Sequence, residues 1–196
     1  MLTRGIGIAA QFVLDRIVQA LSLPWIHPNF LTALGLAINI VAAVLFGKGL
    51  FVAAGLVVLA AGLFDMLDGR VARVTNRVTP FGAFFDSVID RYSDIALFIG
   101  LMVYYARIER FFYVVLVALV MAGSVMISYT RARAESLIPS CKVGFLERPE
   151  RVVLIIIGAL TNRMAPVLWI IAVLSNITVV HRIVYTWQHT QKSALP

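Results

Sequence analysis

The sequence predicts an all-α integral membrane protein with six transmembrane helices, preceded by an N-terminal amphipathic helix at the membrane interface. Of the 196 residues, 61% are hydrophobic and 14% are charged, whereas soluble domains are about 45–50% apolar. Six apolar stretches are long enough to cross a hydrocarbon core of about 30 Å as helices. Backbone groups in lipid need partners within their own segment, and strand-like alternation is absent. We therefore expect a helical bundle within a bilayer.

The interfacial helix is predicted over residues 4–21. Apolar residues recur there at helical spacing, while Arg4, Asp15 and Arg16 interrupt the run, as in helices that lie along a membrane surface. Two prolines within 23–29 then end this helix and begin the next element. The segment lacks a short apolar core with a small-residue cleavage site, so we expect no removable signal peptide.

Six spans follow in order and end near residue 187. No internal repeat or second domain is visible, so residues 1–196 are expected to form one domain. Within it, residues 1–22 would be the juxtamembrane helix and 29–187 the six-helix bundle. The predicted spans are 30–47, 51–76, 81–104, 110–137, 149–165 and 167–187.

The net charge of +7 reflects topology and gives no sign of a nucleic-acid partner. The basic residues are not gathered into a soluble patch with interleaved aromatic residues. With both termini on one side, that side receives thirteen Lys and Arg residues and the other receives four. The positive-inside rule therefore predicts a multi-pass protein of the cell membrane with both termini in the cytoplasm.

Acidic residues are concentrated within the second and third predicted spans. Five of the ten in the chain fall within thirty positions there: Asp65, Asp68, Asp86, Asp90 and Asp94. A carboxylate at membrane depth costs a few kcal/mol on insertion scales, and such residues usually face a polar cavity and serve function. We therefore expect them to form a functional site.

The spacing of four of these carboxylates favours a metal site. Asp65 and Asp68 share one helical face, as do Asp86 and Asp90. A turn near residues 79–80 would bring both pairs together at the cytoplasmic side. Such a cluster repels itself unless cations neutralise it, and oxygen ligands select Mg²⁺, Mn²⁺ or Ca²⁺. Two ions held in this way suit displacement at phosphorus.

The stretch D65-M-L-D68-G69-R-V-A72-R73, eight further residues and G82-A-F-F-D86-S-V-I-D90 resembles a known family signature. At every fixed position it is similar to that of the CDP-alcohol phosphotransferase family. The resemblance implies an enzyme that transfers the lipid-phosphate group of a CDP-linked lipid, such as CDP-diacylglycerol, to an alcohol and releases CMP. It also implies a homodimer, for which Gly55, Ala60, Ala61 and Gly62 would allow close packing.

The resemblance also assigns roles to individual residues. Two Mg²⁺ or Mn²⁺ ions would be held by Asp65, Asp68, Asp86 and Asp90. Asp90 would in addition act as general base on the acceptor hydroxyl. The CDP-lipid would be bound by Asn29, Thr32, Gly69, Arg73 and Gly82.

A second set of residues resembles the phosphatidylinositol-phosphate synthase branch of the family. Arginines beside a metal site suit an acceptor that carries its own phosphate, and in this branch such an acceptor is inositol 1-phosphate. The residues that would bind it are Ser128, Arg131, Arg151 and Arg182. Arg131 stands where lysine is expected, so glycerol 3-phosphate or another alcohol remains an alternative. The arginines could also simply mark topology near anionic headgroups.

The same residues also allow other interpretations. The signature aspartates could form a salt-bridge network with Arg70, Arg73 and Arg77, or bind the transported ion of a cation transporter. Asp94 lies outside the signature and could pair with Arg91 or Arg131. Asn29 could cap a helix. The lone Cys141 is expected to be structural filler.

Overall fold

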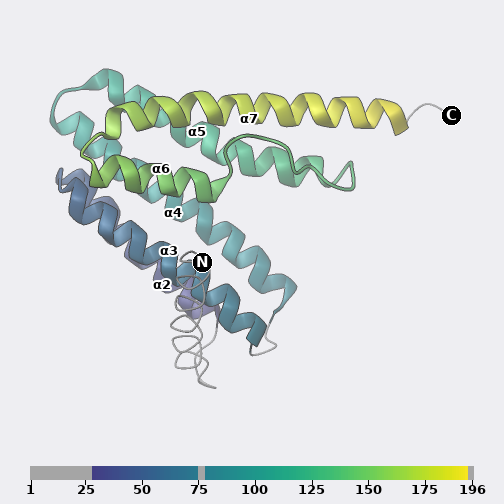
Figure 1. Cartoon of the computed structure of the whole chain (residues 1–196), viewed down its shortest axis with the longest axis horizontal. Helices are drawn as coiled ribbons and strands as arrows, with labels where there is room; N and C mark the ends of the chain where they lie inside the picture. Colours follow the sequence, from purple (N-terminus) through teal and green to yellow (C-terminus); the bar gives the residue numbers. More distant parts are fainter. Residues whose placement is uncertain (1–27, 75–77, 194–196) are drawn as a thin grey trace, which may run out of the picture.

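Six helices make up the described part of the chain (Figure 1). The computed structural model describes residues 28–74 and 78–193, without the side chains of 28, 66–74, 192 and 193. The predicted interfacial helix at 4–21 lies outside this part. The helices are α2 (Pro28–Gly47), α3 (Phe51–Val74), α4 (Pro80–Arg107), α5 (Phe111–Ala134), α6 (Arg148–Leu160) and α7 (Met164–Ser193).

Local signals explain where α4 and α6 begin. The Thr79 hydroxyl accepts a 2.9 Å hydrogen bond from the Gly82 N–H, and Pro80 occupies the first turn of α4, where its missing N–H costs nothing. Glu147 and Glu150 form a capping box at the start of α6, each side chain accepting a bond from the other's backbone. Both helices are thus fixed at the end that faces the carboxylates.

The last two predicted spans differ from the observed helices. The span predicted over 149–165 is too long, because α6 has 13 residues and ends at Leu160, before the left-handed Asn162 with φ of 56°. At 1.5 Å per residue α6 is about 20 Å long, shorter than a hydrocarbon core of about 30 Å. By contrast, α7 continues to Ser193 through a polar segment without proline or glycine.

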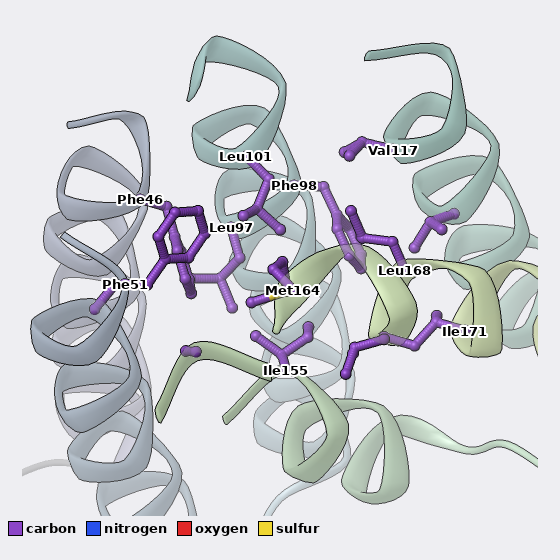
Figure 2. Packing of buried hydrophobic residues seen from close by; sticks show 14 of the residues in the cluster. Phe46, Phe51, Leu97, Phe98, Leu101, Val117, Ile155, Met164, Leu168 and Ile171 are labelled. Carbon is purple, nitrogen blue, oxygen red and sulfur yellow. The ribbon is translucent and has the colours of Figure 1, made fainter. Parts of the chain in front are cut away.

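The bundle closes around a large apolar core (Figure 2). Helix α2 packs on α3 and α4, α5 packs on α4 and α7, and α6 lies against α3 and α7. Phe46, Phe98, Ile155 and Leu168 from four different helices are fully buried in this core. A Cβ at Gly100 would lie 2.2 Å from the Ala43 carbonyl oxygen, so α2 and α4 approach closely only because residue 100 is glycine.

The outer surface is that of a multi-pass membrane protein. Large apolar side chains are exposed along the helices, among them Val41, Leu56, Leu119 and Val173. In the described residues, three segments are long and apolar enough to cross a bilayer: Asn29–Gly47, Phe111–Ala134 and Met164–Gln191.

Two of the small residues expected at a dimer interface are used within the chain. A Cβ at Gly55 would lie 2.8 Å from the Ala159 Cβ of α6, and Ala61 is buried. The close approach that these residues allow is therefore between α3 and its intrachain neighbours.

Candidate active site

Helices α3 and α4 bring three carboxylates together. One oxygen each from Asp65, Asp86 and Asp90 lies within 4.8 Å of the others, and all three residues are half-buried. Asp86 and Asp90 are four residues apart and share one face of α4. Asp68, Gly69 and Arg73 lie in the same helix as Asp65, but the side chains of Asp68 and Arg73 are outside the described part of the chain. The predicted meeting of α3 and α4 carboxylates is thus confirmed for three of the four aspartates.

The chemistry of this donor set fits a divalent cation. Three half-buried carboxylates supply hard oxygen ligands from two helices, as Mg²⁺ and Mn²⁺ require. Their mutual repulsion in a bundle of low polarity would otherwise oppose this packing. The cluster therefore has the composition and closeness of a metal site.

Arg148, the first residue of α6, lies in the middle of the cluster and was not predicted as a site residue. Its Nη1 is 2.7 Å from Asp65 Oδ2 and 2.8 Å from Asp90 Oδ1, and its Nε is 3.8 Å from Asp94 Oδ1. A cation in the first turn of a helix opposes the helix dipole, so it needs carboxylate partners. That unfavourable position, next to Pro149, was the available sequence signal.

Asp94 forms a buried ion pair with Arg151 of α6. The Asp94 and Arg151 side chains are 6% and 1% exposed. The predicted pairing of Asp94 with Arg91 or Arg131 is therefore wrong. Arg91 instead donates to the carbonyl of Ser87 one turn earlier in its own helix.

Arg151 also has donors left over. Its Nε and Nη1 are buried and have no hydrogen-bond partner among the described residues. A buried donor without a partner costs about 1–3 kcal/mol. Two such donors on one guanidinium suit an anionic ligand.

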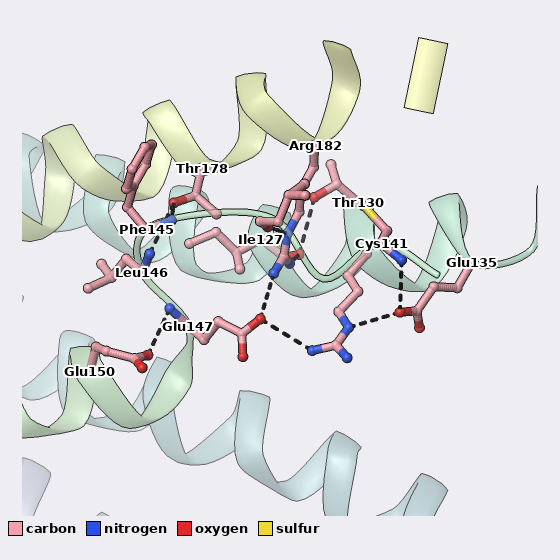
Figure 3. A network of polar contacts seen from close by, with 12 residues as sticks. Ile127, Thr130, Glu135, Cys141, Phe145, Leu146, Glu147, Glu150, Thr178 and Arg182 are labelled. Atoms are coloured by element: carbon pink, nitrogen blue, oxygen red, sulfur yellow. Dashed lines mark hydrogen bonds and ion pairs between the residues drawn. The ribbon is translucent and has the colours of Figure 1, made fainter. Parts of the chain in front are cut away.

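Arg131 and Arg182 both contact the carboxylate of Glu147, and Figure 3 shows Arg182 beside Glu147. Glu147 Oε1 lies 3.4 Å from Arg131 Nη1 and 3.1 Å from Arg182 Nη2. Arg182 is 1% exposed and also donates to the carbonyls of Val143 and Ile127. Ser128 follows Ile127 in α5 and is half-buried. The structure thus groups Arg131 and Arg182, while Arg151 points to α4.

The segment between α5 and α6 positions Glu147 and had no helical pattern to predict it. It runs back beside α7 (Figure 1), where Thr178 Oγ1 accepts bonds from the Phe145 N–H at 3.1 Å and the Leu146 N–H at 3.2 Å. Gly144 has φ of 133°, and a Cβ there would lie 2.4 Å from Thr178 Cγ2. Glycine is therefore required for this segment to reach α7.

This segment helps to enclose a polar cavity beside the arginines. The cavity has a volume of about 460 Å³ and is lined by Arg131, Lys142, Gly144, Phe145, Glu147 and Glu150. Arg131 also forms a 3.1 Å ion pair with Glu135. The cavity is large enough for a small polar molecule and has basic side chains in its wall.

Of the residues expected to bind a CDP-lipid, Asn29, Thr32 and Gly82 lie near the start of α2 and α4, and Gly69 and Arg73 lie in the last turns of α3. A Cβ at Gly82 would be 3.5 Å from Asn29 Oδ1, so Asn29 and Gly82 are neighbours, and Thr32 is buried one turn further along α2. Helix α2 begins at Pro28, which places Asn29 inside its first turn and not at the capping position.

A second cavity runs from the carboxylates into the apolar bundle. It has a volume of about 280 Å³ and lies between α3, α4 and α6. Its polar end contains Asp65, Asp94 and Arg148, and its walls include Val58, Leu59 and Val152. One end thus suits charged groups and the rest suits an apolar chain.

A helical membrane protein with a carboxylate metal site, adjacent arginines and an apolar cavity has the features of an enzyme that acts on lipid phosphates. Residues 25–187 match the CDP-alcohol phosphatidyltransferase family, and the chain belongs to this family. The resemblance drawn from the signature is confirmed. The chain is a transferase of phospholipid synthesis, and the transporter interpretation gives way to an enzyme.

Two relatives are inositol phosphate synthases. An archaetidylinositol phosphate synthase of Methanothermobacter thermautotrophicus is 33% identical over 194 residues, 96% of this chain and 95% of that protein. A phosphatidylinositol phosphate synthase of Mycobacterium tuberculosis is 37% identical over 171 residues, 82% of this chain and 79% of that protein.

Solved structures of a Mycobacterium tuberculosis phosphatidylinositol phosphate synthase have the same fold. The crystal structure with CDP-DAG bound matches with a TM-score of 0.83 and 34% identity, over 89% of this chain and 94% of that one. The complex with manganese and citrate matches with a TM-score of 0.80 and 34% identity, over 89% and 88%.

Proposed function

We propose that this enzyme transfers the lipid-phosphate group of a CDP-linked lipid to inositol 1-phosphate and releases CMP. The observation that carries the choice of acceptor is the buried Arg151 guanidinium with two unpartnered donors. Arg131 and Arg182 both contact Glu147, the residue that caps α6 four positions before Arg151. Guanidinium groups bind phosphate through paired hydrogen bonds. The names of the relatives from two organisms support the same acceptor.

The reaction would take place between the carboxylates and the arginines. Asp90 would accept the proton of the acceptor hydroxyl, whose oxygen forms a bond to the β-phosphorus of the CDP-lipid. The bond from that phosphorus to the bridging oxygen breaks, and CMP leaves with the bond's electron pair. Ser128, Arg131, Arg151 and Arg182 would hold the acceptor phosphate and orient its hydroxyl.

Divalent metal would be bound by Asp65, Asp68, Asp86 and Asp90, and we propose two ions of Mg²⁺ or Mn²⁺. When bound, such ions stabilise charge on the entering and leaving oxygens of a phosphoryl transfer. The manganese in one related structure supports this choice.

The donor lipid would lie along the cavity between α3, α4 and α6. The cytidine and phosphates would contact Asn29, Thr32, Gly69, Arg73 and Gly82. An acyl or isoprenoid chain would follow the apolar wall near Val58 and Val152. The bound CDP-DAG of a related structure supports a CDP-lipid donor.

We further propose a topology for the whole chain. Residues 1–196 would form one catalytic domain, with 1–22 as an interfacial helix and 29–187 as a six-helix catalytic bundle in the membrane. The thirteen-to-four distribution of basic residues supports a cytoplasmic active site and cytoplasmic termini. The enzyme would act as a homodimer.

The proposal is tested by measuring CMP release from purified enzyme with Mg²⁺ and one acceptor at a time. Inositol 1-phosphate, glycerol 3-phosphate, free inositol and serine should be compared, each with diacyl and archaeal CDP-lipids. Inositol 1-phosphate should have by far the highest kcat/KM, because free inositol leaves the guanidinium donors unpaired. Preference for glycerol 3-phosphate, or for an uncharged acceptor, would refute this choice of acceptor.

A further inference from the structure

One nitrogen of Arg148 bridges carboxylates from two helices. Nη1 is 2.7 Å from Asp65 Oδ2 on α3 and 2.8 Å from Asp90 Oδ1 on α4. These are direct contacts, and both aspartates belong to the cluster whose oxygens lie within 4.8 Å of one another. The guanidinium therefore supplies positive charge at the point that the two carboxylates share.

A metal ion and this nitrogen would compete for the same space. Mg²⁺ binds carboxylate oxygen at about 2.0–2.1 Å and Ca²⁺ at about 2.3–2.6 Å. An ion that contacted both Asp65 Oδ2 and Asp90 Oδ1 would occupy nearly the position of Nη1. Repulsion between the two cations adds to this exclusion. Metal bound in this way requires that the guanidinium leave.

The structure offers the Arg148 side chain another position and another carboxylate partner. Its side chain is 25% exposed, and its buried Nε has no hydrogen-bond partner among the described residues. Asp94 Oδ1 lies 3.8 Å from Nε and offers another carboxylate, since Arg151 is bonded to the other oxygen of Asp94. The cavity of about 280 Å³ is lined by both Arg148 and Asp94, so a shift toward Asp94 stays within existing space.

We propose that Arg148 is a positioning residue that exchanges with metal. Without metal, its guanidinium neutralises Asp65 and Asp90 and holds α6 against α3 and α4. When metal binds, the guanidinium moves to Asp94 and faces the polar end of the cavity, where it is ready for an anionic phosphate. Metal loading and phosphate binding are thereby coupled. This inference rests on the proposed metal binding by the carboxylates and adds a residue that competes with it.

If Arg148 instead supported the metal site, its removal would change metal affinity in the opposite direction. A side chain that stayed in place and merely oriented the carboxylates would be an outer-shell partner, and its loss typically weakens metal binding by about 10–100-fold. A competitor that is removed should instead leave the carboxylates free and strengthen metal binding. Metal affinity therefore separates the two roles without any measurement of turnover.

The test is a Mn²⁺ titration of detergent-solubilised full-length enzyme, followed by the electron paramagnetic resonance signal of free Mn²⁺. Arg148→Gln should bind Mn²⁺ roughly 10-fold more tightly than wild type, since one close positive charge is gone. Its thermal unfolding midpoint in chelator should be lower than that of wild type, and Mn²⁺ should raise it by more. Arg148→Lys keeps the charge but not the fork of donors, and should fall between the two.

Arg133→Gln is the matched control. It removes a positive charge from the last turn of α5, where Arg133 donates to Ser136 Oγ and is not ion-paired to the cluster in the described residues. Its Mn²⁺ affinity should stay within about threefold of wild type. Weaker or unchanged Mn²⁺ binding by both Arg148 variants would overturn the inference while leaving the metal site intact. Failure of wild type to bind Mn²⁺ would overturn the metal site as well.

Discussion

Replacing Asp94 with asparagine should destabilise the protein strongly, because it leaves the buried positive charge of Arg151 without its carboxylate partner. The Arg151 side chain is 1% exposed and its partner Asp94 is 6% exposed, so solvent screens neither. Removing one member of a buried ion pair costs about 3–5 kcal/mol. Asparagine keeps one acceptor oxygen for Arg151, which favours the lower end, about 3 kcal/mol. In a chain of this size that corresponds to a fall in Tm of roughly 6–12 °C.

The assay is thermal unfolding in detergent micelles, followed by intrinsic fluorescence. Glu135→Gln is the control, because the Arg131–Glu135 pair has side chains that are 35% exposed and should contribute under about 1 kcal/mol. Replacing both members, with Asp94→Leu and Arg151→Met, should be less destabilising than Asp94→Asn alone. If Asp94→Asn lowers Tm no more than Glu135→Gln does, the buried pair is not what secures α6 to α4.

Three further outcomes concern activity. Each of four aspartates should be replaced singly with Asn: Asp65, Asp68, Asp86 and Asp90. Each change should abolish CMP release while leaving membrane insertion intact, because it removes a charge and keeps the side-chain volume. Near-normal turnover of Asp90→Asn would exclude Asp90 as the base. Chelation should remove activity and Mg²⁺ or Mn²⁺ should restore it, whereas Ca²⁺ should bind without supporting turnover; full activity in metal-free enzyme would exclude metal catalysis. Arg131→Gln should lower kcat/KM for inositol 1-phosphate by roughly 10–100-fold with the KM for CDP-lipid unchanged, while Arg133→Gln, whose guanidinium bonds to Ser136 Oγ, should have little effect.

The carboxylate half of the site could be predicted because helix geometry determines it. Residues three or four apart share a helical face, and a short turn between antiparallel helices forces their ends together. The turn at Thr79 and Pro80 supplied both a cap and a helix start, so Asp86 and Asp90 fall opposite Asp65. The meeting of these carboxylates can therefore be predicted from the local sequence and the membrane setting alone.

The arginine half depended on tertiary contacts that no periodicity encodes. Glu147 reaches Arg131 and Arg182 because the segment before it is bonded to Thr178, thirty-two residues further along the chain from Leu146. That path requires a positive φ at Gly144. Likewise, the sequence suggested Arg91 or Arg131 as the partner of Asp94, whereas the buried partner in the structure is Arg151, fifty-seven positions away.

Charge balance links the two halves and explains why fold and chemistry depend on each other. In the described part of this junction, Asp65, Asp90 and Asp94 are ion-paired to Arg148 or Arg151, and Asp86 lies in the cluster with Asp65 and Asp90. The four carboxylates outnumber these two guanidinium groups by two, in a bundle where burying an unpaired charge is costly. A divalent cation would balance the excess negative charge. The residue that the cation would displace, Arg148, is the first residue of α6. Metal binding should therefore stabilise the junction of α3, α4 and α6 as well as the reaction that occurs there.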